Sequence, residues 1–234
     1  MKKKVKPILS FDLDYTLINN RKGIVNSFNY ALKKFNLPEL NNSIIEKMIG
    51  LPLNNMFAKF TDINPSKLSF TFREYYITRG IYQSKLLPGV KKKLRELKSN
   101  NYSMGIITSK KQNIAIKIVE YLRIEGFFDY ILGETDQIKN KLDPNLARLL
   151  LEKYPEGDFI IIGDHPKDAL LAKSLSCPFI GVLTGFHTAK QLKDSRGNEE
   201  STLILRGIRK LSIDMIESFN YDIDLKKYRL DNKR

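Results

Sequence analysis

The feature that most constrains the fold is a series of short, continuously apolar segments of strand length that alternate with helical patterns. The clearest is Phe159-Ile160-Ile161-Ile162. The predicted strands cover residues 8–13, 102–108, 130–132, 159–162 and 179–182. Strands that are apolar on both faces are typical of a parallel sheet with helices on both sides. The pattern therefore predicts an α/β fold with a doubly wound, Rossmann-like parallel sheet.

One long segment after the first strand contains only helical patterns. Its predicted helices begin near residue 24 and cover residues 24–35, 42–49, 54–61 and 65–79. The sequence Leu87-Pro88-Gly89 then marks a boundary. We therefore predict an α/β core formed by residues 1–19 and 87–234 and an inserted α-helical cap formed by residues 20–86.

Helices are expected between the later strands, over residues 90–98, 112–122, 144–153 and 167–175. Beyond the last of the buried strands, residues 203–205 are predicted to form an edge strand and residues 208–219 a closing helix. The end of the chain, residues 222–234, has mixed charge and is expected to fray.

The composition of the chain indicates the cellular compartment and the kinds of partner to expect. The chain has 234 residues, a single cysteine (Cys177) and a net charge of +14. One cysteine permits no internal disulfide, and no stretch approaches the ~18 apolar residues of a membrane span, so we predict a cytoplasmic protein without a membrane partner. The lysines are scattered and no zinc-finger spacing is present, so we predict no nucleic-acid partner; the charge would attract an anionic ligand instead. A monomer and a homodimer both remain open.

Two carboxylates, Asp12 and Asp14, stand where the first strand ends. Residues two apart in a strand point to the same side, and like charges held close together repel unless they share a cation or a proton. Aspartates are also common as turn residues at strand ends, and the pair alone does not separate the two interpretations.

Other polar side chains follow the strands in the same way. In a doubly wound sheet, ligands bind beyond the carboxyl ends of the strands. The candidates at this edge, together with a lysine from the loop before residue 144, are Asp12, Asp14, Thr16, Thr108, Ser109, Lys141 and Asp164.

Four motifs in a fixed order carry a family resemblance. They are Asp12-Leu13-Asp14-Tyr15-Thr16-Leu17, Ile106-Ile107-Thr108-Ser109, Asn140-Lys141-Leu142-Asp143-Pro144 and Ile162-Gly163-Asp164-His165-Pro166-Lys167-Asp168. Together they resemble the haloacid dehalogenase-like hydrolase superfamily over residues 8–182. The helical insert is similar in position to the cap of the branch that includes phosphoglycolate phosphatase and β-phosphoglucomutase, and Gly50-Leu51-Pro52 resembles a loop of such caps.

The resemblance implies a role for each motif. Asp12 would be the nucleophile that forms an aspartyl-phosphate, and Asp14 the general acid and base. A Mg²⁺ cofactor would bind Asp12, the backbone carbonyl of Asp14, and Asp164. The implied phosphate-binding residues are Thr108, Ser109 and Lys141, and the supporting residues are Thr16 and Asp168.

Some assignments keep an alternative. Asp168 would bind the metal's waters or orient Lys141, and it also suits the first turn of the following helix. Lys139 is a rival to Lys141, which is preferred because Leu142-Asp143-Pro144 follows it.

Departures from the common family pattern concern a few single residues. Tyr15 stands where glycine is commonest and His165 where a small polar residue is usual, and we interpret His165 as a loop residue. We interpret His187 as structural and Cys177 as a buried small hydrophobe.

The predicted function is that of a Mg²⁺-dependent phosphoric monoester hydrolase acting on a small phosphorylated metabolite, either phosphoglycolate-like or a sugar phosphate. The alternatives are a phosphomutase of the β-phosphoglucomutase type and, from a different class, a non-catalytic anion-binding module. Because Asp12, Asp14, Thr108, Lys141 and Asp164 are all intact, the sequence favours an enzyme over the module.

Overall fold

The computed structural model describes residues 6–155, 157–197 and 200–219. The chain divides into two compact units. One contains the described parts of Met1–Leu17, Leu87–Ile116 and Ile124–Arg234, and the other contains Ile18–Leu86 and Lys117–Arg123. None of the described helices is long and apolar enough to cross a membrane.

The first unit is built on a six-stranded sheet whose neighbouring strands all run parallel. The strand order is β5-β4-β1-β6-β7-β8. The strands are β1 (Ile8–Phe11), β4 (Met104–Lys111), β5 (Tyr130–Glu134), β6 (Phe159–Gly163), β7 (Phe179–Val182) and β8 (Thr202–Leu205). The chain runs outward from β1 to β5 and then returns to β6 on the other side of β1, so the direction of winding changes beside β1.

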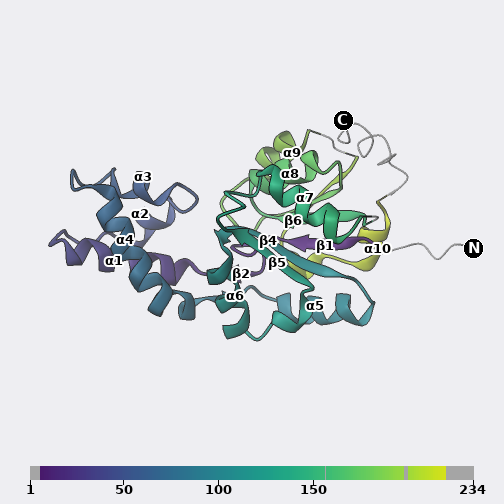
Figure 1. The fold of residues 1–234 in the computed structure, drawn as a ribbon, viewed down its shortest axis with the longest axis horizontal. Coiled ribbons are helices and arrows are strands. Elements are labelled where there is room, and N and C mark those ends of the chain that lie inside the picture. Colours follow the sequence, from purple (N-terminus) through teal and green to yellow (C-terminus); the bar gives the residue numbers. More distant parts are fainter. Residues whose placement is uncertain (1–5, 156, 198–199, 220–234) are drawn as a thin grey trace, which may run out of the picture. The chain divides into compact units, whose positions relative to one another are not determined.

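Helices cover both faces of this sheet. They are α5 (Val90–Ser99), α7 (Pro144–Lys153), α8 (Pro166–Ser174) and α9 (Ala189–Arg196). A further helix, α6 (Gln112–Tyr121), begins in this unit, and its residues from Lys117 onward belong to the second unit. Figure 1 shows α7, α8 and α9 on one face and α5 on the other, as right-handed crossovers require when the winding reverses. The prediction of a doubly wound α/β fold is therefore confirmed.

The central strands are buried because their side chains are apolar in both directions. Every residue of β1 is buried, and Leu9 and Phe11 have no exposed surface. One core cluster under α7, α8 and α9 includes Leu146, Phe179 and Cys177. The interpretation of Cys177 as a buried small hydrophobe is confirmed, and burial raises the pKa of its thiol to about 12.

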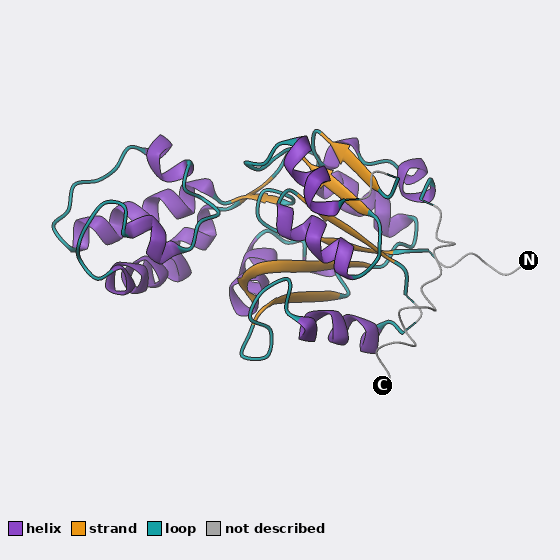
Figure 2. Cartoon of the chain, turned by 90° about the horizontal axis from the view of Figure 1, so that it is seen from above, coloured by secondary structure: helices purple, strands orange, loops and turns teal. Residues whose placement is uncertain are grey.

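The second unit is helical apart from a short ribbon (Figure 2). Its helices are α1 (Arg21–Lys34), α2 (Asn42–Glu46), α3 (Leu53–Phe57), α4 (Pro65–Tyr75), a π-helical turn (Tyr76–Gly80) and a 3-10 turn (Ile81–Gln83). The rings of Phe28 in α1 and Phe57 in α3 stack with centroids 4.1 Å apart. The ribbon pairs β2 (Ile18–Asn19) with β3 (Lys85–Leu86) antiparallel. That residues 20–86 act as a cap over the site stays a prediction.

Several elements differ from the sequence-based expectations. The helices predicted over residues 42–49, 54–61 and 65–79 end earlier, at Glu46, Phe57 and Tyr75. The ribbon was not predicted, because strands of two residues have no periodicity to detect. Helix α9 was also missed, although Thr188 and Gln191 form a capping box at its start. The prediction of one closing helix over residues 208–219 was wrong, because a 3-10 turn (Ile208–Lys210) is followed by the separate helix α10 (Ile213–Glu217). The Ser212 side chain accepts a hydrogen bond from the Met215 amide and so starts the new helix. The predicted edge strand is confirmed as β8, and residues 222–234 lie outside the described residues.

Candidate active site

The site is built where three neighbouring strands end. Asp12 follows β1, Thr108 lies in β4, and Asp164 follows β6. Because Phe11 is in register with both Ile106 and Ile162, the segments that follow these residues reach the same edge of the sheet. All the residues described in this section belong to the first unit.

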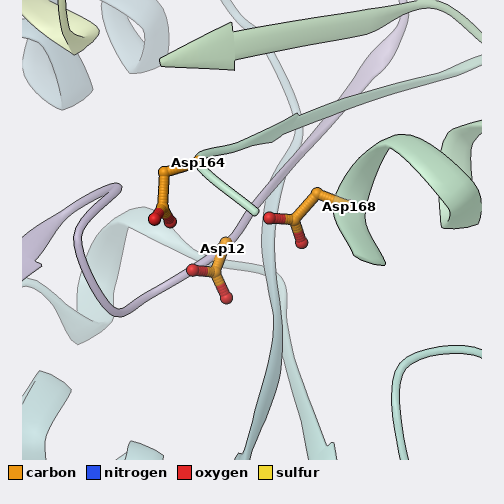
Figure 3. A group of neighbouring side chains, drawn as sticks. All are labelled: Asp12, Asp164 and Asp168. Atoms are coloured by element: carbon orange, nitrogen blue, oxygen red, sulfur yellow. The ribbon is translucent and has the colours of Figure 1, made fainter. Parts of the chain in front are cut away.

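Lys141 is the centre of a buried group of charges. The Lys141 side chain is 3% exposed. Its ammonium donates hydrogen bonds to Oδ1 of Asp12 and, at 2.5 Å, to Oδ1 of Asp168. Figure 3 shows the carboxylates of Asp12, Asp164 and Asp168 facing one common space. Lys139, the rival in the sequence, is exposed. Lys141 is therefore the lysine that the fold brings to Asp12.

The loop before α7 explains how Lys141 reaches this position. Asn140 accepts a hydrogen bond from the Leu142 amide at 2.8 Å, and Asp143 accepts one from the Lys139 amide at 2.8 Å. Asp143 also caps α7 through the Asn145 amide. These local side-chain bonds fix a tight turn in which the lysine between them points into the protein.

Asp168 supports Lys141 from the first turn of α8. Its Oδ2 accepts the His165 amide at 3.0 Å, while Oδ1 accepts the ammonium of Lys141. Both of its oxygens are thus engaged. Two of the roles raised by the sequence coexist here, because Asp168 completes the capping box of α8 and contacts Lys141. A role in binding the metal's waters stays a prediction.

Asp164 is held between two loops. Its Oδ1 accepts a hydrogen bond from the hydroxyl of Thr16 at 3.1 Å. The backbone of Gly185 lies so close that a Cβ there would come within 1.8 Å of Oδ2 of Asp164. Only glycine fits at that position without displacing the carboxylate.

Burial and mutual repulsion raise the pKa values of two carboxyl groups in this site. Burial raises the pKa of Asp12 to about 7, and the charges of Asp168 and Asp14 add to the effect while Lys141 opposes it. Burial together with the charges of Asp12 and Asp168 raises the pKa of Asp164 to about 9. Burial opposes the charge of Lys141, but its two carboxylate partners prevail and its pKa is raised. Three carboxylates with one ammonium leave an excess of negative charge, and a cation would relieve it.

The donor set fits a hard cation. Oxygen atoms of Asp12, Asp164 and Asp168 lie within 4.8 Å of one another. Since Asp168 uses both oxygens for other partners, Asp12 and Asp164 are the better ligands: each has a second oxygen that accepts no hydrogen bond among the described residues. Carboxylate oxygens without nitrogen or sulfur donors suit Mg²⁺ or Ca²⁺.

The β4 side of the site contains the two predicted residues, Thr108 and Ser109, and one residue that was not predicted. Thr108 is buried, and its hydroxyl accepts the Lys110 amide at 3.2 Å, whereas the Ser109 side chain is exposed. Lys110, which sequence reasoning did not select, forms an ion pair with Asp14, with Nζ 3.0 Å from Oδ2. The sequence places Lys110 two residues after Thr108, near the end of a predicted strand, but it gives no indication that the side chain turns towards Asp14.

Tyr15 adopts the left-handed backbone conformation, with φ of 57°. This region favours glycine, the residue expected there by resemblance. The Thr184 hydroxyl donates to the backbone carbonyl of Tyr15, and the Tyr15 ring packs edge-to-face on Phe186 with centroids 4.9 Å apart. These contacts hold the turn between Asp12 and Thr16 in place of a glycine.

The two histidines of the chain meet beside Asp164. The rings of His165 and His187 pack edge-to-face with centroids 4.4 Å apart. Nδ1 of His165 accepts the Lys167 amide at 3.0 Å and caps α8, and burial lowers its pKa to about 4. His165 therefore caps α8, as a small polar residue at this position could also do. The interpretation of His165 as a plain loop residue did not include this capping role. Burial also lowers the pKa of His187, while a hydrogen bond with the Asp164 backbone opposes this effect.

Comparison with known proteins places this arrangement in a family. Residues 9–182 match the haloacid dehalogenase-like hydrolase family. The chain is 30% identical to the pyrophosphatase PpaX of Oceanobacillus iheyensis, with 78% of this chain and 86% of that protein covered. It is 26% identical to the phosphoglycolate phosphatase of Yersinia pestis, with 80% and 85% covered.

A solved structure agrees with the sequence relatives. A haloacid dehalogenase-like family hydrolase from Streptococcus pneumoniae superposes with a TM-score of 0.73 at 28% identity, covering 85% of this chain and 93% of that one. The chain therefore belongs to the haloacid dehalogenase-like hydrolase family. The prediction of an enzyme is confirmed at the level of a phosphatase of this family.

Proposed function

We propose that the chain is a Mg²⁺-dependent phosphatase that hydrolyses a small phosphomonoester through an aspartyl-phosphate on Asp12. The observation that carries this proposal is the buried contact of Lys141 with both Asp12 and Asp168, with the Asp164 carboxylate beside them. A carboxylate that is oriented by a buried ammonium at a strand end is positioned to act as a nucleophile. The ammonium is also suited to receive phosphoryl oxygens.

The first half of the reaction transfers the phosphoryl group to the enzyme. A carboxylate oxygen of Asp12 attacks phosphorus, so an O–P bond to Asp12 forms while the ester P–O bond breaks. The departing oxygen takes a proton from the carboxyl of Asp14 and leaves as an alcohol. Lys141 and the Thr108 hydroxyl hold the phosphoryl oxygens during this step.

The second half restores the enzyme. Asp14, now ionised, accepts a proton from a water molecule as that water attacks phosphorus. The bond between Asp12 and phosphorus breaks, inorganic phosphate leaves, and Asp14 is protonated again for the next cycle. One carboxyl group therefore serves as the acid in the first step and, once ionised, as the base in the second step.

Residues of the same edge would hold the cofactor. Asp12, Asp164 and the backbone carbonyl of Asp14 are the proposed ligands, and Thr16 orients Asp164 through its hydroxyl. When bound, Mg²⁺ supplies the positive charge that offsets the repulsion between these carboxylates and a phosphate group.

The substrate class is proposed from the relatives. A phosphoglycolate phosphatase is among them, and the net charge of +14 favours an anionic ligand such as a small phosphorylated metabolite. Residues 20–86 are proposed to act as a cap that excludes water and selects the leaving group. Phosphoglycolate-like compounds and sugar phosphates are the first candidates.

The test is phosphate release from a panel of small phosphomonoesters, measured with Mg²⁺ and with a chelator. Release that needs Mg²⁺ and is lost in Asp12→Asn supports the proposal. The asparagine keeps the shape of the side chain but lacks a nucleophilic carboxylate. No release from any compound by the folded protein, or release that survives in Asp12→Asn, would overturn it. Transfer of the phosphoryl group to a sugar in place of water would identify a mutase.

A further inference from the structure

An irregularity in β4 brings Lys110 to the site. The pairing of β4 with β5 passes from Ile107 opposite Leu132 directly to Lys111 opposite Glu134. The β4 strand thus carries extra residues between these pairs, and Lys110 is among them. Such bulges bend a strand and redirect its side chains, often beside active sites.

The redirected side chain reaches the carboxylate of Asp14. Nζ of Lys110 is 3.0 Å from Oδ2 of Asp14, and the two side chains are 12% and 29% exposed. Oδ1 of Asp14 is buried and accepts no hydrogen bond among the described residues. One oxygen of the carboxylate is therefore anchored by Lys110, and the orientation of the carboxylate depends on that contact.

This pair differs from the ion pairs on the protein surface. Lys190 and Asp194 are 85% and 61% exposed, and pairs of that kind contribute little because water competes and the side chains are free to move. The Lys110 side chain is mostly buried, so its ammonium has few alternative positions. It constrains the orientation of the Asp14 carboxylate more strongly than a surface lysine would.

We propose that Lys110 is a positioning residue for the acid–base carboxylate. Its ammonium holds Oδ2 of Asp14 and so fixes the orientation of the carboxyl group that faces the leaving oxygen and, later, the attacking water. This inference rests on the proposed function, because it assigns Asp14 the acid–base role. Lys110 acts through Asp14 and transfers no proton itself.

The first experiment compares two kinds of ester. The leaving group of p-nitrophenyl phosphate departs as a stable phenolate with little need of a proton, whereas an alkyl phosphate needs the acid. The value of kcat/KM reports the step that breaks the ester bond. In Lys110→Met we expect kcat/KM to fall by about tenfold or more for the best alkyl phosphate of the panel and by less than about twofold for the aryl phosphate.

Two matched variants accompany this change. Lys111→Met removes the same charge from the neighbouring exposed position of β4, and we expect kcat/KM to stay within about twofold for both esters. Lys110→Arg keeps a cation beside Asp14, and we expect it to restore most of the alkyl activity. Urea unfolding of each variant shows that the protein remains folded.

A double-mutant cycle with Asp14→Asn tests the route of the effect. If Lys110 acts through Asp14, adding Lys110→Met to Asp14→Asn produces no further loss with the alkyl phosphate. An equal loss for both esters, a loss that persists in the Asp14→Asn background, or a rise in KM alone would overturn the inference and indicate a structural or substrate-binding role.

Failure of the proposed function gives a different result. In that case the wild-type protein releases no phosphate, or Asp12→Asn retains the activity, and the inference falls with it. If the wild type is active and Asp12→Asn is not, the proposed function stands. The ratio between the two esters in Lys110→Met, together with the double-mutant cycle, then decides the role of Lys110.

Discussion

Tyr15 is one of the described non-glycine residues whose backbone is left-handed, with φ of 57°. A non-glycine residue in the left-handed region is disfavoured by about 1–2 kcal/mol. The Tyr15 side chain is buried against Phe186, and Thr184 binds its carbonyl. The packing of the ring therefore offsets the unfavourable φ.

We expect Tyr15→Ala to be less stable than Tyr15→Gly by about 1 kcal/mol, because both lose the ring but only glycine relieves the backbone. Urea unfolding of the two variants measures the difference. At Arg148, which lies within helix α7 and is 63% exposed, the order should reverse, because glycine weakens a helix. The same order at both positions would show that φ of Tyr15 is not strained.

The two acids with raised pKa values make stability depend on pH. Folded Asp12 and Asp164 have pKa values of about 7 and about 9, above the ordinary value of 3.8. Between about pH 4 and about pH 9 these two carboxyl groups bind more protons in the folded state than in the unfolded chain, so their contribution to stability is lost as the pH rises through the folded pKa values. The lowered pKa values of His165 and His187 act in the opposite sense below about pH 6.5, so the loss is clearest from about pH 7 to about pH 9.

We expect the free energy of unfolding in the presence of a chelator to fall by a few kcal/mol from about pH 7 to about pH 9, above the range in which the histidines titrate in either state. Added Mg²⁺ should reduce this fall, because the cation replaces the protons. Asp164→Asn should show a smaller slope without the metal, since one of the two ionisations is gone. A stability that stays level or rises over this range in chelator would contradict the prediction. Urea unfolding at a series of pH values makes the measurement.

Helix α8 shows how one element serves both stability and the site. His165 caps it, Asp168 completes the capping box, and Asp168 also holds Lys141. The orientation of the Lys141 ammonium thus depends on how the helix begins.

We expect His165→Ala to lower the free energy of unfolding by about 1 kcal/mol, because the Lys167 amide loses its acceptor. His165→Asn should restore most of this stability, since asparagine is a favourable cap. Thermal or urea unfolding gives the comparison. If the asparagine variant is no more stable than the alanine variant, the edge-to-face contact with His187 and not the cap is the main contribution.

The sequence predicted the elements whose side chains carry a strong pattern. Strand β6 is apolar on both faces and was predicted almost to its bounds, and α7 was predicted from its apolar spacing and the proline at its start. The missed α9 is mostly polar, so its signal lay in the Thr188 cap and not in periodicity. Local capping chemistry is visible in sequence, but it competes with turns that use the same residues.

The candidate site could be predicted only in part for a related reason. Asp12 and Asp164 stand at the ends of apolar strands, where topology alone brings them together. Lys110 and Gly185 could not be selected in this way. Lys110 depends on a bulge in β4, and Gly185 depends on a close backbone approach to Asp164. Both are properties of three-dimensional packing that leave little trace in a single sequence.

At the scale of the whole molecule, the net charge of +14 acts on any anionic substrate before it reaches the site. A protein with a large excess of positive charge raises the local concentration of anions and their rate of encounter. Dissolved salt screens this attraction over about 10 Å at 0.1 M, whereas the buried contacts of Lys141 are screened far less.

We therefore expect KM for the best phosphomonoester to rise by at least about threefold between about 0.05 M and about 0.5 M NaCl while kcat changes little, because salt weakens long-range attraction without altering the buried charges. Steady-state kinetics at constant Mg²⁺ measures both quantities. The variant Lys190→Glu, at an exposed position, changes the net charge by two units without touching the site, and it should raise KM slightly at low salt and have no effect at high salt. A fall in kcat with unchanged KM would show that salt disturbs the site itself and that the overall charge has no part in capturing the substrate.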